Sequence, residues 1–256
     1  MISIFFLVAG LVGVVVSAIY TFKNKISFFK GICCASLSWL VSFVLSVLYE
    51  RSMYGISPID YAIDLTFSQL KAVISELPQE IIGAFTGGES VEVFKATMLS
   101  EIENMKNMYV MLYPAIMIIT YTLLIFILFM LIKSILRLMK KNVSFIPCFN
   151  EIALNKQVLL GCVFSILMAY MFSDTVAGNV FANIQLLFAA YIVLCGFSIM
   201  DYYLARKIGI GVVRLVLYTG LILFGGGLFV FALEIAAFMA VLDAFKNFRA
   251  DSSKWV

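Results

Sequence analysis

Long runs without charge constrain this chain more than any other feature of its sequence. The first run, Met1–Phe22, has no charged side chain, and comparable runs recur toward the C-terminus. A helix needs about 20 consecutive apolar residues to cross the hydrocarbon core of a bilayer. Composition agrees, because only 13% of the 256 residues are charged, whereas a typical soluble domain has about 25%. The sequence therefore predicts an all-α fold, a polytopic transmembrane helical bundle.

Five of the predicted spans are separate apolar segments: Met1–Phe22, Gly31–Tyr49, Met108–Ile132, Val158–Phe172 and Val180–Met200. The remaining stretch, Ile208–Leu242, carries three consecutive glycines near its middle. It is either one long helix or a hairpin of two short helices. Basic residues flank both of its ends, and the positive-inside rule places such residues on one side of the membrane. A hairpin meets that rule, so we expect about seven spans, with six as the alternative.

The charged residues divide between two kinds of connecting segment. Fourteen of the 18 basic residues lie in loops and a C-terminal tail that share one face in this arrangement. Nine of the 15 acidic residues lie in the segment 50–107. The positive-inside rule then predicts an outside N-terminus and a cytoplasmic C-terminus. The chain would comprise two N-terminal transmembrane helices over 1–49, an acidic extracytoplasmic helical segment over 50–107, and a five-helix transmembrane region over 108–256.

The acidic segment has helical periodicity of its own. Apolar residues recur at intervals of three and four, at Ile59, Ile63, Phe67, Leu70 and Ile74. The stretches SELPQEIIGAF and VEVFKATMLSEIENM predict two further short amphipathic helices, separated by breaks at Pro78 and at Gly87-Gly88. These helices would either pack on the outer surface of the bundle or act as a lid over a substrate.

One glutamate, Glu234, lies inside the last apolar run. An ionised carboxylate facing lipid at mid-depth costs several kcal/mol, so this side chain should face the bundle, be protonated or touch water. In the hairpin Tyr218 would lie opposite and donate a hydrogen bond. Asn183 and Gln185 would line the outer mouth of a small cavity. Two readings stay open for Glu234, a structural hydrogen bond between helices and a contact to a ligand or ion.

Small residues recur every four positions along one face of each of the first two predicted spans: Ala9, Gly13 and Ser17, then Ser38, Ser42 and Ser46. Small side chains let helix backbones approach closely in lipid, where no hydrophobic drive brings helices together. The two faces therefore predict either helix packing within the chain or a docking seam for another membrane subunit.

Signatures of catalysis are absent from the sequence. There is no histidine, and the five cysteines form no C-x-x-C pair. There is also no P-loop, no G-x-S-x-G and no carboxylate pair within a span. A net charge of +3 is too small to indicate a nucleic-acid partner. We therefore expect a protein that is not an enzyme, with no catalytic residue, no metal site and no cofactor.

The C-terminal end resembles a known family. The stretch FMAVLDAFKNFR follows a glycine-rich turn, and it resembles the ending of the YybS-like bacterial membrane proteins, a family named as a domain of unknown function. Five residues carry that motif: Asp243, Phe245, Asn247, Phe248 and Arg249. The stretches YPAIMIITY and SFIPCFNEIALNK also resemble the start of the family's central span and the loop after it. The resemblance covers about 108–250 well and 10–80 loosely, and it implies a bacterial plasma membrane.

Such proteins are similar in architecture to the substrate-binding components of energy-coupling-factor vitamin transporters, which lack an ATPase of their own. The resemblance implies a ligand site, here Glu234, Tyr218, Asn183 and Gln185, and membrane subunits as partners. The face of Ala9, Gly13 and Ser17 is the nearest match to the docking face of that group. The alternative is a non-transporting scaffold in a cell-envelope assembly complex. Its outer helices and its basic loop over 133–156 would then bind proteins or anionic lipid.

Overall fold

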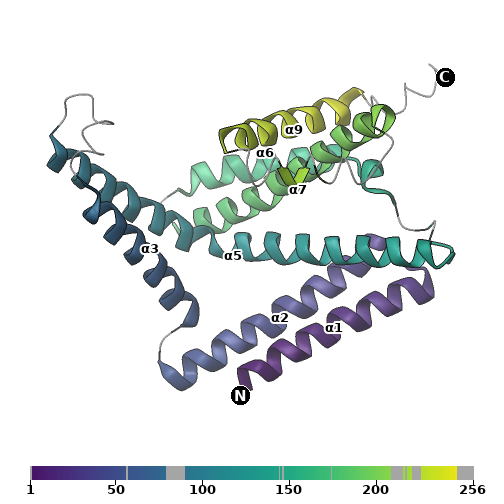
Figure 1. The fold of residues 1–256 in the computed structure, drawn as a ribbon, viewed down its shortest axis with the longest axis horizontal. Helices are drawn as coiled ribbons and strands as arrows, with labels where there is room; N and C mark the ends of the chain where they lie inside the picture. The colour runs from purple at the N-terminus through teal and green to yellow at the C-terminus, as the bar shows by residue number, and fades with distance from the viewer. Residues whose placement is uncertain are drawn as a thin grey trace. The chain divides into compact units, whose positions relative to one another are not determined.

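The structure is a computed structural model (Figure 1), and it describes residues 2–55, 57–78, 90–143, 145, 147–173, 175–208, 216, 218–220 and 226–246. Within these residues every regular element is a helix and none is a strand, which confirms the predicted all-α fold. The chain divides into two compact units, Met1–Phe129 and Met130–Val256, and the division falls inside one long helix.

In the first unit, α1 (Ile2–Asn24) and α2 (Phe28–Tyr54) lie side by side as a helical hairpin (Figure 1). The turn between them passes through Lys25, whose φ of 52° is left-handed. The N–H of Ile26 donates to the carbonyl of Thr21 at 3.2 Å. This bond across six residues is the Schellman ending of a helix, in which glycine usually takes the left-handed position.

Aromatic rings join this hairpin to the third apolar helix. The Phe28 ring lies 5.8 Å from that of Phe126 and 6.0 Å from that of Phe129. Phe129 also contacts Phe22, with ring centroids 5.8 Å apart. Phe28 and Phe129 have almost no exposed surface. Aromatic pairs add about 0.5–1.5 kcal/mol beyond the area that they bury, so these rings form a core of the first unit.

The third apolar helix, α5 (Val91–Leu138), is 48 residues long. At 1.5 Å per residue it measures about 72 Å, more than twice the ~30 Å hydrocarbon core. The sequence predicted a short outer helix ending near Met105 and a span beginning at Met108, and the structure joins the two. No glycine or proline lies between Val91 and Pro114 to break the helix, and the helix continues through Pro114.

Helix α3 (Pro58–Glu76) belongs to the acidic segment. Ser57 caps its N-terminus, because the Ser57 hydroxyl accepts a hydrogen bond from the N–H of Asp60 at 3.4 Å. Pro58 takes the first helical position, where its missing N–H is harmless. The predicted helix over this segment is therefore present, with Ile63 buried. The predicted break at Gly87-Gly88 lies outside the described residues.

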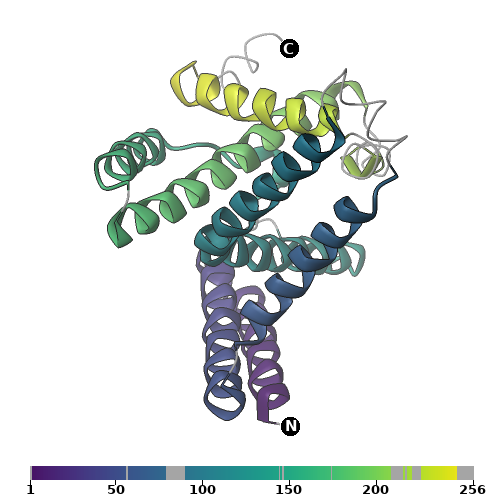
Figure 2. The same ribbon diagram turned by 90° about the vertical axis from the view of Figure 1, so that its left-hand side faces the viewer.

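The second unit is built around α7 (Val176–Lys207). It runs beside both α6 (Lys156–Met171) and α9 (Gly227–Lys246) in the two views of the fold (Figure 1, Figure 2). The short 3-10 helix η1 (Phe149–Glu151) also contacts α7. The Ser198 hydroxyl on α7 donates to the carbonyl of Ile152 at 2.8 Å, which fixes the segment after η1.

Five helices of the described chain are long and apolar enough to cross a membrane, namely α1, α2, α5, α7 and α9. Helix α6 has only 16 residues, so it is shorter than the roughly 20 residues that a full span needs. Helix α9 begins at Gly227, after Gly226 turns through a φ of 44°. An uninterrupted helix over Ile208–Leu242 is therefore not formed, while most of the predicted first arm lies outside the described residues.

Candidate functional site

Glu234 lies on the outer face of α9. The opposite face is lined by alanines at every fourth position, Ala232, Ala236 and Ala240, and these are buried. Glu234 is exposed, as is its neighbour Phe238. The Glu234 carboxylate has no hydrogen bond or ion pair among the described residues. The polar side chain therefore shares its face with apolar side chains that suit lipid or a partner helix.

The other three predicted ligand residues lie in different surroundings. The ring of Tyr218 meets that of Phe197 edge to face, with centroids 6.0 Å apart. The Asn183 amide donates to the carbonyl of Asn179 at 2.8 Å, within α7. Gln185 is half-buried on the same helix. These contacts fit packing roles for Tyr218 and Asn183, and the role of the four residues in ligand binding stays a prediction.

The small residues of the first two helices meet one another. A Cβ placed on Gly13 would lie 1.7 Å from the Ser38 hydroxyl, and one on Gly10 would lie 2.9 Å from the Cβ of Ser42. Ser46 is buried and Ser17 is half-buried, whereas Ala9 is exposed. Most of the predicted docking seam therefore packs within the chain, between α1 and α2. Docking of a partner along it stays a prediction.

Part of the C-terminal motif is described. Asp243 is buried, and Phe245 is exposed, with the Lys156 ammonium 5.7 Å from its ring centroid. Asn247, Phe248 and Arg249 lie outside the described residues.

A second buried carboxylate, Asp201 on α7, was not singled out from the sequence, although it is only 9% exposed. A sequence pattern could have identified Asp201 as a candidate. Like Asp243, it follows a long apolar run and precedes an aromatic residue and then a basic residue.

Charged side chains connect α3 to the first half of α5. Lys71 forms an ion pair with Glu103, and Lys106 forms one with Asp64 at 2.7 Å. Lys95 also donates to the carbonyl of Ser75 at 2.7 Å. We call this pair of segments, Pro58–Glu76 and 91–107, the charged hairpin. Its ion pairs lie before the apolar part of α5, which begins at Met108.

The ion pairs of the charged hairpin shift the affinity of their groups for protons. The pKa of the Glu103 carboxyl lies below its ordinary value, chiefly because Lys71 donates a hydrogen bond to it. The pKa of Lys106 lies above its ordinary value, chiefly because its ammonium donates a hydrogen bond to Asp64. Both shifts favour the charged pair at neutral pH, so the hairpin is held together electrostatically where water can reach it.

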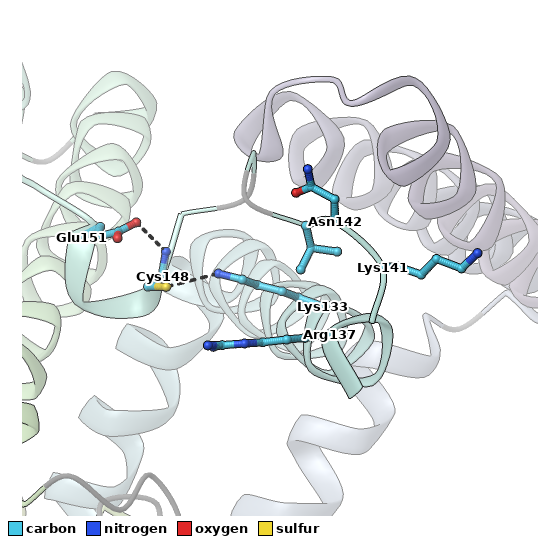
Figure 3. A pocket seen from close by; sticks show the side chains of 7 residues that line it. Lys133, Arg137, Lys141, Asn142, Cys148 and Glu151 are labelled. Carbon is cyan, nitrogen blue, oxygen red and sulfur yellow. Dashed lines mark hydrogen bonds between the residues drawn. The ribbon is translucent and has the colours of Figure 1, made fainter. Parts of the chain in front are cut away.

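A pocket of about 420 Å³ lies in the second unit, beside the end of α5 (Figure 3). Its lining residues come from the last turns of α5 and from the loop that leads to η1: Lys133, Arg137, Lys141, Asn142, Val143, Cys148 and Glu151. Three of these seven side chains are cationic and one is anionic, so the pocket is basic. We call it the basic pocket.

The end of α5 shapes the basic pocket. The N–H of Lys141 donates to the carbonyl of Leu136, and the N–H of Lys140 donates to that of Arg137. Lys140 has a φ of 58°. These bonds form a Schellman motif, although a left-handed lysine is less favourable than glycine. The sequence has no glycine at this turn. The reversal of the chain that leads the loop back toward η1 could therefore not be predicted.

Among the described residues, no group of three or more His, Cys, Asp or Glu side chains is placed to hold a metal ion. The basic pocket holds the side chains of Cys148 and Glu151, and both are committed to local contacts. The Cys148 N–H donates to the Glu151 carboxylate at 2.7 Å, and the Lys133 ammonium lies 3.4 Å from the Cys148 sulfur. The arrangement suits an anion better than a cation, because three of its four charged side chains are cations.

In the described part of the chain, five helices long and apolar enough to cross a bilayer define an all-helical integral membrane protein. The chain belongs to the family described as Predicted membrane protein (DUF2232), whose model matches residues 2–244. Searches of curated proteins and of solved structures found no match. The family match supports a membrane protein over nearly the whole chain. It carries neither the YybS-like name nor a relationship to energy-coupling-factor components, so both of these stay predictions.

Proposed function

We propose that this protein is a membrane scaffold that holds the charged hairpin outside the bilayer for partner proteins, and that it has no catalytic activity of its own. The continuity of α5 carries the proposal, because one helix includes both an apolar span and half of the hairpin. A partner bound to the hairpin would thereby be fixed to a transmembrane helix. In this arrangement the N-terminus lies outside and the C-terminus lies in the cytoplasm of a bacterial cell.

The charged hairpin has an apolar stripe that suits a protein partner. Tyr61, Leu65 and Val73 on α3 are exposed, and they are separated by multiples of four residues. Residues at such spacing share one face of a helix. Exposed apolar stripes outside the membrane are typical of protein interfaces, and a helix that docks in a groove does so through such a face.

The test is a mild-detergent purification from native membranes, followed by mass spectrometry of the proteins that accompany the chain. We expect a defined set of partners, and we expect the triple variant Tyr61→Ser, Leu65→Ser, Val73→Ser to lose it. The control is Ser68→Ala with Ser75→Ala, which changes exposed positions of the same helix and keeps the three apolar side chains. Retention of the full set by the triple variant would refute the scaffold proposal.

A second candidate is the substrate-binding membrane component of a small-molecule, vitamin-like transporter without its own ATPase. Glu234 favours the transporter candidate, because an ionisable residue within a span destabilises the protein in the membrane and such residues often serve transport. Tyr218, Asn183 and Gln185 would complete the ligand site. For this candidate, Glu234→Gln should abolish ligand binding and leave the fold intact. An ATPase pair and a coupling subunit should also accompany the purified protein, whereas a scaffold would bring neither.

A further inference from the structure

The basic pocket lies within the basic loop over 133–156, apart from the charged hairpin on which the proposed scaffold function rests, and its charges are arranged for a ligand. Figure 3 shows the side chains of Lys133 and Arg137 extending side by side toward the loop, because they are four residues apart on α5. Lys133 donates to the carbonyl of Pro147 at 3.0 Å, which orients its ammonium. The Arg137 guanidinium makes no hydrogen bond or ion pair within the described part of the chain.

The one acidic residue of the pocket does not neutralise these cations by an ion pair. Glu151 accepts the hydrogen bond of the Cys148 N–H, and no ion pair of Glu151 occurs among the described residues. Lys141 extends away from Lys133 and Arg137, so its charge lies at the rim (Figure 3). The Arg137 guanidinium therefore has no counter-ion among the described residues, and it offers a planar fork of donors.

The position of the pocket along α5 indicates which anion it would meet. Lys133 directly follows the apolar segment that ends at Ile132. The next two turns expose the apolar side chains of Ile135, Leu138 and Met139 beside the cations. Apolar and basic side chains alternate in this way at the depth of lipid head groups, where the cations reach the phosphates and the apolar side chains reach the acyl boundary.

We propose that the basic pocket binds the phosphate group of an anionic membrane lipid. Arg137 would form the bidentate contact, Lys133 would donate the second charge-assisted hydrogen bond, and Lys141 would add attraction from the rim. Basic pockets at the membrane surface recognise anionic head groups in this way. A volume of about 420 Å³ lies within the range of about 300–1,000 Å³ that small-ligand sites occupy.

The proposal is tested with the full chain in nanodiscs, by native mass spectrometry of retained lipid and by titration with fluorescent phosphatidylglycerol against phosphatidylcholine. We expect a preference for phosphatidylglycerol that Arg137→Gln lowers about fivefold, because one cation near the surface is worth about 1 kcal/mol. Lys141→Gln should lower the preference less. Arg137→Lys should give an intermediate value, because it keeps the charge and loses the fork.

Lys207→Gln is the matched control. It removes one positive charge from the exposed end of α7, in the same unit and outside the pocket. It should leave the preference unchanged. An equal loss in Lys207→Gln and Arg137→Gln would overturn the proposal, because the preference would then come from the general surface charge. An unchanged preference in Arg137→Gln would overturn it as well.

Two further measurements complete the test. One distinguishes an effect on the pocket from unfolding of the protein, and the other distinguishes binding of a lipid from binding of free phosphate. Glu151→Gln should tighten phosphatidylglycerol binding, since it removes the only acid of the pocket and keeps an acceptor for the Cys148 N–H. Damage to the fold would not tighten binding. Inorganic phosphate at millimolar concentration should fail to displace the fluorescent lipid. Full displacement would identify free phosphate as the ligand and reject the lipid.

Discussion

Two helix pairs, α1–α2 and α7–α9, use glycine to bring helices together, but the glycine meets different atoms in each. Between α1 and α2, a Cβ on Gly13 would meet the hydroxyl of Ser38. Between α7 and α9, a Cβ on Gly196 would lie 1.8 Å from the backbone carbonyl oxygen of Ala236. A side chain can rotate away from an added methyl group, whereas a helix backbone can move only if the whole helix moves.

The two contacts differ in how firmly they fix the geometry of their unit. Helices in lipid associate by close packing and by hydrogen bonds between helices, without a hydrophobic drive. The backbone contact at Gly196 is supported by the buried row Ala232, Ala236 and Ala240. The contact at Gly13 is one of several in a seam of serine and glycine. We therefore expect α7–α9 to tolerate less change than α1–α2.

The largest effect is expected from Gly196→Ala. The added methyl group would force α9 away from α7, and overpacking of this kind destabilises by about 1–3 kcal/mol. We expect the upper end of that range, measured as the free energy of unfolding in mixed detergent micelles.

The control for this variant is Gly220→Ala, because nothing lies within 4 Å of a Cβ at Gly220. That change should be neutral or slightly stabilising, since alanine is the better helix former. Equal stabilities for the two variants would mean that the α7–α9 contact is not as close as the structure shows.

A smaller effect is expected from Gly13→Ala, about 1 kcal/mol, because the Ser38 hydroxyl can rotate. The double variant Gly13→Ala, Ser38→Ala removes the nearest clashing atom and should recover at least half of the loss. A double-mutant cycle measures this coupling directly. Full additivity of the two changes would contradict the predicted contact and remove the distinction between the two helix pairs.

The smallest effect is expected in the charged hairpin, whose helices are held by ion pairs rather than by small residues. The pKa of Glu103 is lowered by Lys71, so this carboxyl stabilises the hairpin above its unfolded pKa. That contribution is lost as the pH falls through the lowered pKa. Once corrected for the intrinsic exchange rate at each pH, the α3 amides should therefore lose protection from hydrogen exchange in acid.

The variant for this test is Glu103→Gln, which should remove that part of the acid dependence. The control is the exposed Glu101, since Glu101→Gln removes an equal charge without touching the pair. The same acid response in both variants would show that the Lys71–Glu103 pair does not hold the hairpin in solution.

Part of the site was visible in the sequence and part was not. The basic cluster after the third span could be predicted, because an arginine and two adjacent lysines lie close together in the chain. The pocket could not, because it needs Glu151 and Cys148 to return beside Lys133 after a turn through a left-handed Lys140. The seam of α1 and α2 could be predicted as close packing, because its small residues recur every four positions.

The all-α fold, the membrane environment and the approximate positions of the described spans could be predicted from the sequence alone. These follow from apolar runs whose length matches a bilayer, so they are local properties of the chain. The three-dimensional packing was needed to show that α5 is one helix of 48 residues, that Gly196 lies against the backbone of Ala236, and that Asp201 and Asp243 are buried. Each of these features depends on which helices pack against one another. Hydropathy indicates only how deep a residue lies in the membrane. The packing between helices determines which residues it contacts.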